Sequence, residues 1–238
     1  MTSEEYLVST ENNDILTHTE LESLCEWPTP AIANAIETFD IRSRAAGFTN
    51  SEIVCRFPEL GIKAGYAVTA KMRASIPGEE DPQTVDRDLL IEAMLSQPGP
   101  KFLVIQDLDQ PSVGSWWGEV NSTRHTALGG VGVITDGGIR DLDEMRGMGF
   151  LALSKHVLVS HGYMHLVEVG GAVEVGGMLV RPGDLIVADQ HGAIQVPSSI
   201  ARDIPAAAAE IELKERKTIA FYTDPAYSPG DQLEGKYP

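Results

Sequence analysis

The residues with the clearest chemical potential are Arg140 and Asp141, neighbours in the stretch DGGIRD at 136–141. An arginine guanidinium can hold a carboxylate through two parallel hydrogen bonds. An aspartate carboxylate offers the hard oxygen ligands that Mg²⁺ and similar ions prefer. Because adjacent side chains point in different directions, the two groups can serve two parts of one substrate instead of neutralising each other.

The surroundings of this pair allow both a functional and a structural role. The apolar run VGVIT at 131–135 leads into Gly137 and Gly138, which permit a tight turn and a close approach of the backbone to a ligand. Strand ends of this kind are where α/β proteins bind ligands. Alternatively, Asp141 caps a helix and Arg140 pairs with a surface acid. Residue types alone leave both interpretations open.

Other residues are weighed in the same way. His161 and His165 have the i, i+4 spacing of zinc ligands on a helix, but their segment is typical of strand and turn, which favours structural or loop histidines. Trp116 and Trp117 could line an aromatic pocket or pack at a helix or subunit contact. Glu119 stands at a predicted helix start, where a carboxylate suits the helix dipole or joins a site.

The elements that must position these residues alternate between helices and strands, and then become β-rich. We expect a layered α/β fold with a mixed sheet or barrel core, and one domain over residues 1–238. The final predicted helix begins at Ser198 or Ser199 and is interrupted near Pro205. Helices are predicted at 19–25, 29–39, 86–97, 118–130, 140–149 and 198–221, and strands at 63–75, 101–110, 131–138 and within 150–197.

The composition narrows the possible partners. The chain has 238 residues, 42% of them hydrophobic, and a formal net charge of −17. This acidity argues against a nucleic-acid backbone or an anionic membrane as the main partner. Small anionic substrates remain compatible, because a local arginine or metal can reverse the sign of charge within a pocket.

The compartment is predicted from cysteines and apolar runs. Cys25 and Cys55 form neither a metal-binding spacing nor a disulfide framework, as expected of free thiols in a reducing cytosol. The polar, acidic segment 1–18 is typical of neither a signal nor a transit peptide. No apolar run approaches the ~20 residues needed to span a bilayer. We therefore expect a soluble, cytoplasmic protein without a membrane partner.

Taken together, several stretches resemble the RraA-like family, which includes 4-hydroxy-4-methyl-2-oxoglutarate/4-carboxy-4-hydroxy-2-oxoadipate aldolases. The segment WGEVNSTRHTALGGVGVITDGGIRD at 117–141 is similar to its signature, and VEVGGMLVRPGDLIVADQHGAIQVP at 173–197 to its closing motif. TPAIANAIE and GYAVTAK extend the similarity, which covers most of 29–216. The signature falls on Gly118, Glu119, Gly129, Gly132, Asp136, Gly137, Arg140 and Asp141.

The resemblance implies a fold, an assembly and a chemistry. The fold is an αββα sandwich, assembled as a homotrimer or a dimer of trimers with active sites between subunits. Arg140 is then the carboxylate clamp and Asp141 the ligand of a divalent metal, Mg²⁺ or Mn²⁺. The metal would polarise a 2-oxo group during retro-aldol cleavage or oxaloacetate decarboxylation. Glu119 lies beside this site, and Glu212 or Glu215 is lent by a neighbouring subunit.

One loop departs from the family pattern. The aldolases carry a glycine-rich segment with an aspartate before the W-G-E motif, whereas this chain has QDLDQPSVGSWW at 106–117. Asp107 or Asp109 could stand in for that aspartate. Substrate contacts are therefore expected at Arg140, Gly118, Asp109 and Trp117.

The resulting hypothesis is a metal-dependent lyase acting on a small 2-oxo acid. Two alternatives come from the same resemblance. One is a non-catalytic regulator that inhibits an RNA-degrading endonuclease by direct contact, for which an acidic surface is suited to a basic partner. The other is an enzyme on this scaffold with a different carboxylic acid as substrate, since a fold does not determine a reaction.

Overall fold

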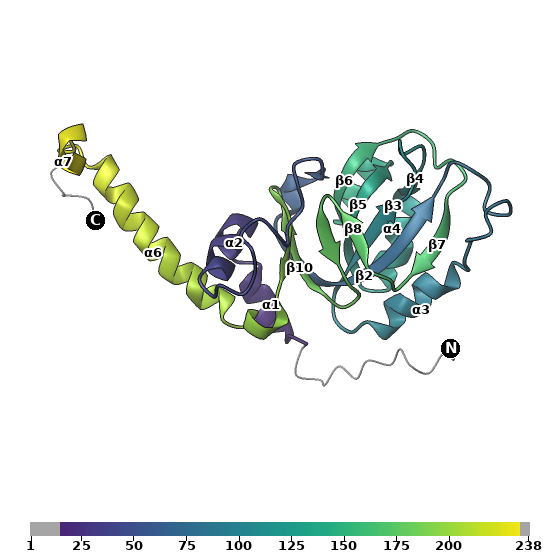
Figure 1. Cartoon of the computed structure of the whole chain (residues 1–238), viewed down its shortest axis with the longest axis horizontal. Coiled ribbons are helices and arrows are strands. Elements are labelled where there is room, and N and C mark those ends of the chain that lie inside the picture. Colours follow the sequence, from purple (N-terminus) through teal and green to yellow (C-terminus); the bar gives the residue numbers. More distant parts are fainter. Residues whose placement is uncertain (1–14, 234–238) are drawn as a thin grey trace.

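The centre of the fold is a mixed sheet of nine strands (Figure 1). The computed structural model describes residues 15–233. The main path runs β1-β6-β5-β3-β2-β10-β11, with β4 added to β5 and β7 added to β2. Its strands are β1 (Val54–Cys55), β2 (Lys63–Arg73), β3 (Lys101–Asp107), β4 (Ser115–Trp117), β5 (Gly130–Ile139), β6 (Leu151–Val157), β7 (His165–Val169), β10 (Leu185–Asp189) and β11 (Gly192–Val196).

The four strands β2, β3, β5 and β6 are parallel, and both of their faces are buried. In strand β3, alternate side chains pack into hydrophobic cores on opposite faces of the sheet. Leu103 and Ile105 enter the core on one face, while Phe102 and Val104 enter the core on the other. This alternation follows from the two-residue period of a strand. It explains why these strands read as continuous apolar runs.

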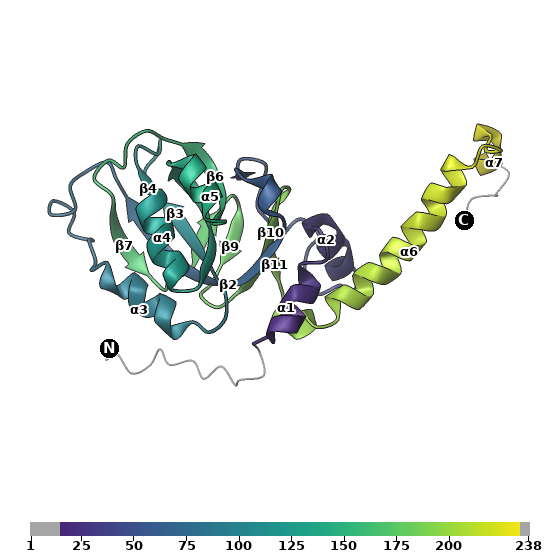
Figure 2. The same cartoon turned by 180° about the vertical axis from the view of Figure 1, so that it is seen from behind.

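Helices cover one face of the sheet and a two-stranded ribbon covers the other (Figures 1 and 2). The helical face carries α3 (Asp88–Ser96), α4 (Glu119–Ala127) and α5 (Leu142–Gly147). The ribbon pairs β8 (Val173–Val175) with β9 (Met178–Val180). A second helical group packs near β10 and β11 and comprises α1 (His18–Leu24), α2 (Thr29–Glu37) and α6 (Ile204–Thr223). The chain continues into α7 (Pro229–Leu233).

The expected layered α/β fold with a mixed, nearly closed sheet is confirmed, and three local predictions are corrected. Pro205 starts α6 instead of interrupting it, because proline suits the first helical turn, and Ser198–Ile200 forms a separate 3₁₀ turn. Strand β5 extends to Ile139, beyond the two glycines where the apolar pattern predicts its end. The proline- and glycine-rich tail includes the short helix α7. We expected no targeting peptide within residues 1–18. Residues 1–14 of that segment lie outside the described part of the chain.

The described helices were also compared with the requirements of a membrane span. None of them, within residues 15–233, is both long and apolar enough to cross a bilayer.

Candidate active site at the ends of β4 and β5

Two neighbouring strand ends bring the predicted site residues together. Strands β4 and β5 run parallel, with Ser115 opposite Gly138 and Trp117 opposite Ile139. The backbone N–H of Arg140 then donates to the carbonyl of Trp117 at 2.9 Å. This pairing places Gly118 and Glu119, which follow β4, beside Arg140 and Asp141, which follow β5. The carboxyl ends of parallel strands thus form the site, as expected for α/β proteins.

Asp141 occupies an unusual backbone conformation. Its φ and ψ are 54° and 51°, in the left-handed region that residues other than glycine adopt at a cost. Its Oδ2 accepts a hydrogen bond from the backbone N–H of Glu119 at 3.0 Å. Asp141 therefore caps the start of α4 across the gap between strands and makes no side-chain cap to its own helix, α5. The cap that we considered as a structural alternative exists, but on a different helix.

The other carboxylate oxygen of Asp141 is free. Among residues 15–233 no group donates a hydrogen bond to its Oδ1, and the side chain is 38% exposed. The Arg140 side chain is 37% exposed, and its Nε lies 3.7 Å from Asp141 Oδ2, beyond hydrogen-bonding distance. Arg140 and Asp141 therefore form an ion pair without a hydrogen bond, and Asp141 Oδ1 keeps an open position beside the partly exposed guanidinium.

Gly118 is required by this arrangement. A Cβ atom at this position would lie 2.3 Å from Asp141 Oδ2 and 3.1 Å from Cγ of Arg140. The first distance is shorter than any ordinary Cβ contact, so the Asp141 carboxylate would have to move, and the second is a tight contact. A glycine here therefore allows the Asp141 carboxylate to lie directly against the start of α4.

The donor set suits a hard divalent cation held partly by water. The described residues contain no group of three or more histidine, cysteine, aspartate or glutamate side chains that could enclose a metal. Asp141 nevertheless offers a free carboxylate oxygen at the surface, and Mg²⁺ usually keeps several waters and takes one or two carboxylates. The residues fit a metal bound in that open manner, with Asp141 as its protein ligand.

Two further carboxyl groups lie close together, Asp107 at the end of β3 and Asp136 within β5. The backbone N–H of Asp107 donates to Asp136 Oδ1 at 2.7 Å. Asp107 is 2% exposed, and its Oδ2 has no hydrogen-bond partner among the described residues. Burial raises the pKa of Asp107 and raises the pKa of Asp136 to about 6. Gly137 permits this packing, because a Cβ there would lie 3.1 Å from Asp107 Oδ2.

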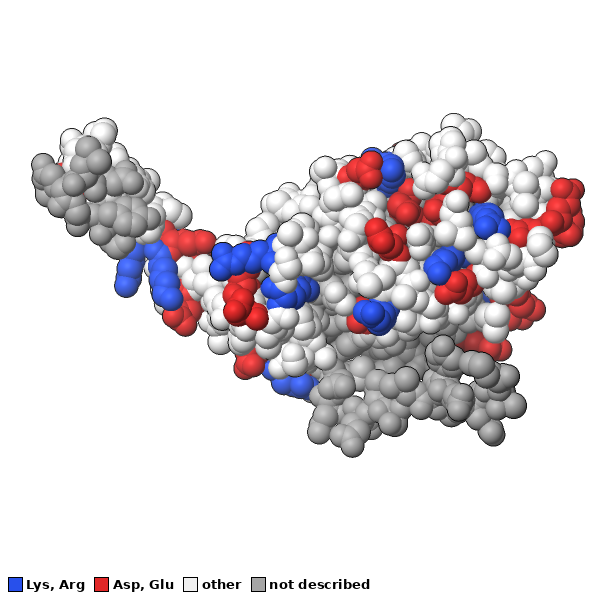
Figure 3. Space-filling view, in the orientation of Figure 1, with Lys and Arg blue, Asp and Glu red and all other residues white. Residues whose placement is uncertain are grey.

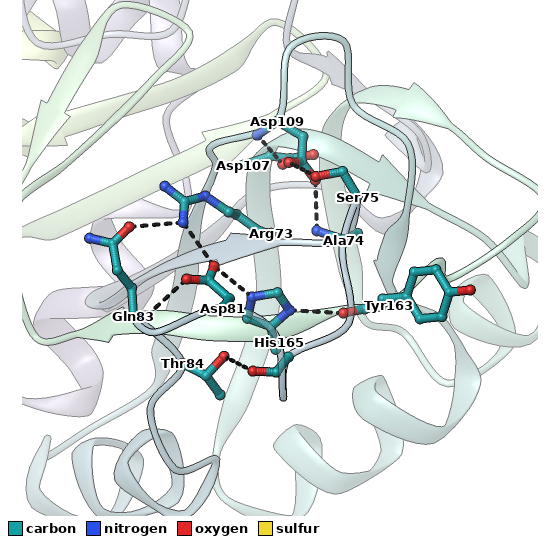
Figure 4. Close-up of polar contacts among 11 residues, drawn as sticks. Arg73, Ala74, Ser75, Asp81, Gln83, Thr84, Asp107, Asp109, Tyr163 and His165 are labelled. Atoms are coloured by element: carbon teal, nitrogen blue, oxygen red, sulfur yellow. Dashed lines mark hydrogen bonds and ion pairs between the residues drawn. The ribbon is translucent and has the colours of Figure 1, made fainter.

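Asp109 holds the loop between β3 and β4 in place through hydrogen bonds. Its Oδ2 accepts from the backbone N–H of Ala74 at 2.6 Å, and its Oδ1 accepts from the Ser75 hydroxyl at 2.6 Å (Figure 4). The Asp109 N–H donates to Asp107 Oδ1 at 2.9 Å. Asp109 therefore joins the loop to the segment that follows β2, with both of its oxygens engaged.

Trp117 and Glu119 occupy contrasting environments. The Trp117 side chain is 1% exposed and packs among core residues, 5.2 Å from the His125 ring centroid. Its contribution next to Arg140 comes from its carbonyl. The Glu119 side chain is exposed at the first position of α4, while its backbone N–H binds Asp141.

Glu212 and Glu215 lie far from this pair within one chain. Both are on α6, which packs on α2 and extends away from the sheet, on the side opposite α4 and α5 (Figures 1 and 2). Glu212 pairs with Arg216, and Glu215 Oε1 accepts from Asn34 at 3.4 Å. A single chain therefore does not bring either glutamate to Arg140 and Asp141.

Two groups of residues were missed by our sequence-based predictions of the site. Asp136 was noted only as a motif position, although its place at the end of an apolar strand indicated burial. Asp81 and His165 form a buried ion pair, His165 Nε2 to Asp81 Oδ2 at 3.0 Å, across 84 positions of sequence. No local pattern could have indicated that contact.

The fold and the candidate site define a class, a mixed α/β protein with candidate site residues at parallel strand ends, and comparison with known proteins supports the fold. The sequence profile of the RraA-like family, described as Aldolase/RraA, matches residues 29–195. The chain belongs to the RraA-like family. The resemblance seen in the sequence motifs is thereby confirmed.

The individual proteins that resemble this chain share about a third of its residues or fewer in the matched regions. An uncharacterized protein of Methanocaldococcus jannaschii is 32% identical over 102 residues, which cover 42% of this chain and 49% of the archaeal protein. The chain thus matches about half the length of that relative. A crystal structure from Pseudomonas syringae pv. tomato has a TM-score of 0.69 at 21% identity, covering 93% of this chain and 95% of its own.

A third relative belongs to a family named for an inhibitor. Streptomyces coelicolor RraAS2, an unusual member of the RNase ES inhibitor RraA protein family, has a TM-score of 0.65 at 24% identity. The match covers 85% of this chain and 97% of that one. At 21% and 24% identity, the Pseudomonas and Streptomyces structures establish that the fold is shared, and they carry no conclusion about activity.

Proposed function

We propose that this protein is a divalent-metal-dependent lyase acting on a small 2-oxo acid. The observation that carries the proposal is the Asp141 carboxylate, held in a left-handed backbone conformation with one oxygen free, beside the partly exposed Arg140 guanidinium with which it forms an ion pair at 3.7 Å. A strained residue with an open ligand position is a feature of functional sites.

In this mechanism Arg140 binds the carboxylate of the 2-oxo acid through its planar fork. Asp141 would hold Mg²⁺ or Mn²⁺, which when bound would supply a Lewis acid for the 2-oxo group. In retro-aldol cleavage a water molecule at this solvent-exposed site accepts the proton of the 4-hydroxyl. The C3–C4 bond then breaks, C4 leaves as the carbonyl carbon of a second product, and the pyruvate enolate takes up a proton from water at C3. Arg140 contributes to stabilising the negative charge that develops during that step.

The test is metal-dependent release of pyruvate, measured by coupling to lactate dehydrogenase. A 4-hydroxy-2-oxo dicarboxylate and oxaloacetate are supplied with Mg²⁺ or Mn²⁺, and with EDTA as the metal-free arm. Arg140→Ala and Asp141→Asn are expected to lower kcat/KM at least about 100-fold. Arg124→Ala, an exposed arginine on α4, is the matched control and keeps its activity. Absence of metal-dependent pyruvate from every substrate overturns the proposal.

The assembly belongs to the same proposal. The second half of α6 exposes Leu213 at 64% and Ile219 at 59%, although the helix extends from the body. Apolar groups on a projecting helix are suited to burial against another copy of the chain. We propose a homotrimer or dimer of trimers in which Glu212 or Glu215 reaches a neighbour's site. Glu212→Gln and Glu215→Gln then lower activity without changing the sedimentation coefficient of the assembly.

Four further residues act indirectly in this proposal: Asp109, Gly118, Glu119 and Trp117. Gly118 leaves room for the Asp141 carboxylate, and the Glu119 N–H holds it in position. The Glu119 side chain is exposed to solvent near the proposed metal ligand. Asp109 and Trp117 act through loop structure and backbone. The chain is proposed to form one domain, because the described helices pack on a single large sheet. A cytoplasmic location is proposed from its membership of the RraA-like family.

The second candidate is a non-catalytic regulator of a nuclease. The net charge of −17 favours it, because an acidic surface attracts a basic protein partner. On the face shown in Figure 3, acidic and basic side chains are interspersed, without a single broad basic patch. A pull-down with an RNA-degrading endonuclease separates the candidates. Tight binding combined with no metal affinity would favour the regulator.

A further inference from the structure

Three buried polar atoms, where β4 leads into α4, have no hydrogen-bond partner within residues 15–233. They are the indole Nε1 of Trp117, the hydroxyl oxygen of Ser122 and Nε2 of His125. The three residues are 1%, 0% and 2% exposed, so bulk water does not reach their side chains. A polar group buried without a partner is costly, and native proteins contain few of them. The proposed lyase mechanism uses none of these three atoms.

The three side chains pack at one place. The ring centroids of Trp117 and His125 are 5.2 Å apart. Ser122 and His125 are three residues apart on α4, and residues at that spacing lie side by side on one helix face. Both are buried, whereas the intervening Thr123 and Arg124 are exposed. The face of α4 that carries Ser122 and His125 is therefore turned towards the protein interior, where Trp117 lies.

The donor and acceptor roles of the three atoms follow from their chemistry and from one contact. An indole N–H only donates, and a hydroxyl group both donates and accepts. His125 Nδ1 lies 2.7 Å from the carbonyl oxygen of Asn121, which only accepts, so Nδ1 carries a hydrogen. Burial lowers the pKa of His125, which favours the neutral ring. Nε2 of His125 is then an unprotonated acceptor.

We infer that Trp117 Nε1, Ser122 Oγ and His125 Nε2 together bind one buried water molecule. This water accepts from the indole N–H, donates to the imidazole nitrogen and forms a third hydrogen bond with the hydroxyl group. Buried waters in proteins typically make about three such bonds. An anion would face the lone pair of His125 and a cation would face the indole N–H, so the mixed polarity selects a neutral ligand. The burial of all three side chains selects a small one.

The water joins β4 to α4 at the turn that carries the candidate site. The Trp117 carbonyl accepts from the Arg140 N–H at 2.9 Å, and the Glu119 N–H, at the start of α4, donates to Asp141 Oδ2 at 3.0 Å. A fixed connection between β4 and α4 therefore helps to position both site residues. That consequence rests on the proposed function, whereas the water site itself does not.

A crystal structure of the full chain, at a resolution that shows ordered water, tests the inference directly. One water peak is expected within about 3.2 Å of Trp117 Nε1, Ser122 Oγ and His125 Nε2. A structure without a water at this position, or with direct hydrogen bonds among the three side chains, overturns the inference. A negative pyruvate assay leaves it standing, because the peak is observed without substrate or metal.

The ring nitrogens of His125 provide a second test, by ¹⁵N NMR at neutral pH. The resonances are assigned by their loss in His125→Phe. The expected chemical shifts are those of a protonated Nδ1 and an unprotonated Nε2. A protonated Nε2 overturns the inference, because that atom could not accept a hydrogen bond from water.

Ser122→Ala gives a third test, by thermal melting. Removing a hydroxyl group that binds a buried water destabilises the protein, whereas removing an unpartnered buried hydroxyl group is neutral or stabilising. We expect the melting temperature to fall by about 2–4 °C. Thr123→Ala, at an exposed hydroxyl residue on the same helix, is the control for helix propensity and should not lower it. An unchanged or higher melting temperature in Ser122→Ala contradicts the water site.

Discussion

At the scale of single residues, the candidate site depends on what surrounds one carboxylate. Asp141 is capable of binding a metal because its Oδ2 is held by the Glu119 N–H and its Oδ1 is left free by the described residues. The same side chain thus performs the structural role and offers the functional role that the sequence left as alternatives. A cap on α4 orients the group, and orientation is what an open metal site requires.

Gly118→Ala tests that orientation. The new Cβ would lie 2.3 Å from Asp141 Oδ2, so the carboxylate must move away from α4. We expect metal affinity and kcat/KM to fall at least about tenfold, and the free energy of unfolding to fall by about 1–3 kcal/mol.

Gly147→Ala is the matched control for this substitution. A Cβ atom at this position would have no neighbour within 4 Å among the described residues, and the residue ends α5. Alanine at this position is expected to leave activity unchanged and to raise stability by up to about 1 kcal/mol. Equal metal affinity in Gly118→Ala and wild type, measured by calorimetry, would contradict the role given to Gly118.

Asp136→Asn tests the half-buried carboxyl group of Asp136. The folded-state pKa of about 6 exceeds the ordinary value of 3.8, so folding favours the protonated form of Asp136. Its stabilising contribution is therefore complete below about pH 4 and is lost as the pH rises through 6. Asparagine keeps an oxygen acceptor for the Asp107 N–H and does not ionise.

The expected result is a variant that gains stability only at higher pH. Relative to wild type, Asp136→Asn should gain about 2 kcal/mol at pH 7 and little at pH 4, measured by urea unfolding across that range. Asp143→Asn, at an exposed acid with no burial, is the control. A stability difference that is the same at pH 4 and pH 7 would show that ionisation of Asp136 is not its cause.

At the scale of elements, the short loop between β3 and β4 affects where the candidate site residues lie. Asp109 joins the β3–β4 loop to the residues after β2, and the register of β4 against β5 then sets where Gly118 meets Asp141. A change in the loop therefore reaches the site through strand position. This connection explains how a loop without the family's glycine-rich segment can still support the Arg140–Asp141 pair.

Asp109→Ala is expected to loosen this connection. The Ala74 N–H and the Ser75 hydroxyl would lose their acceptor in a part-buried setting, at a cost of about 2–3 kcal/mol. Hydrogen exchange measured by mass spectrometry should accelerate in peptides covering 107–117 and 74–76. Asp143→Ala, which removes an exposed carboxylate on α5, should leave those peptides unchanged. Unaltered exchange in Asp109→Ala would show that the loop is held by other contacts.

At the scale of the whole molecule, α6 is the element that the rest of the described chain leaves incompletely covered. It packs on α2 near its start, and its outer part exposes Leu213 and Ile219 (Figure 1). RraA-like proteins are commonly oligomeric, and a projecting helix with apolar groups is consistent with assembly. The proposed lyase site would then be complete only in the assembly.

Leu213→Glu combined with Ile219→Glu tests assembly through α6. Placing two charges in an apolar contact is expected to raise the dissociation constant of the assembly at least about 100-fold, observed by sedimentation velocity. Leu95→Glu, at an α3 leucine that is 70% exposed, is the matched control. An unchanged assembly in the double variant would place the subunit contact elsewhere.

The sequence by itself determined the class of fold, its main strands and the Arg140–Asp141 pair. Those features depend on local patterns, because apolar periodicity reports burial and the motif is contiguous. It could not place Pro205 at a helix start or extend β5 to Ile139, since element boundaries depend on packing partners. It also assigned Asp109 to the substrate, whereas its oxygens are engaged by Ala74 and Ser75.

Only the tertiary structure decided which distant groups meet. Asp141 caps α4 because β4 and β5 end side by side, 22 positions apart in sequence from Glu119 to Asp141. Asp81 reaches His165 across 84 positions, and His165 leads the contacts that lower the pKa of Asp81. Charge state, burial and free ligand positions are properties of surroundings in space, and chain order does not contain them.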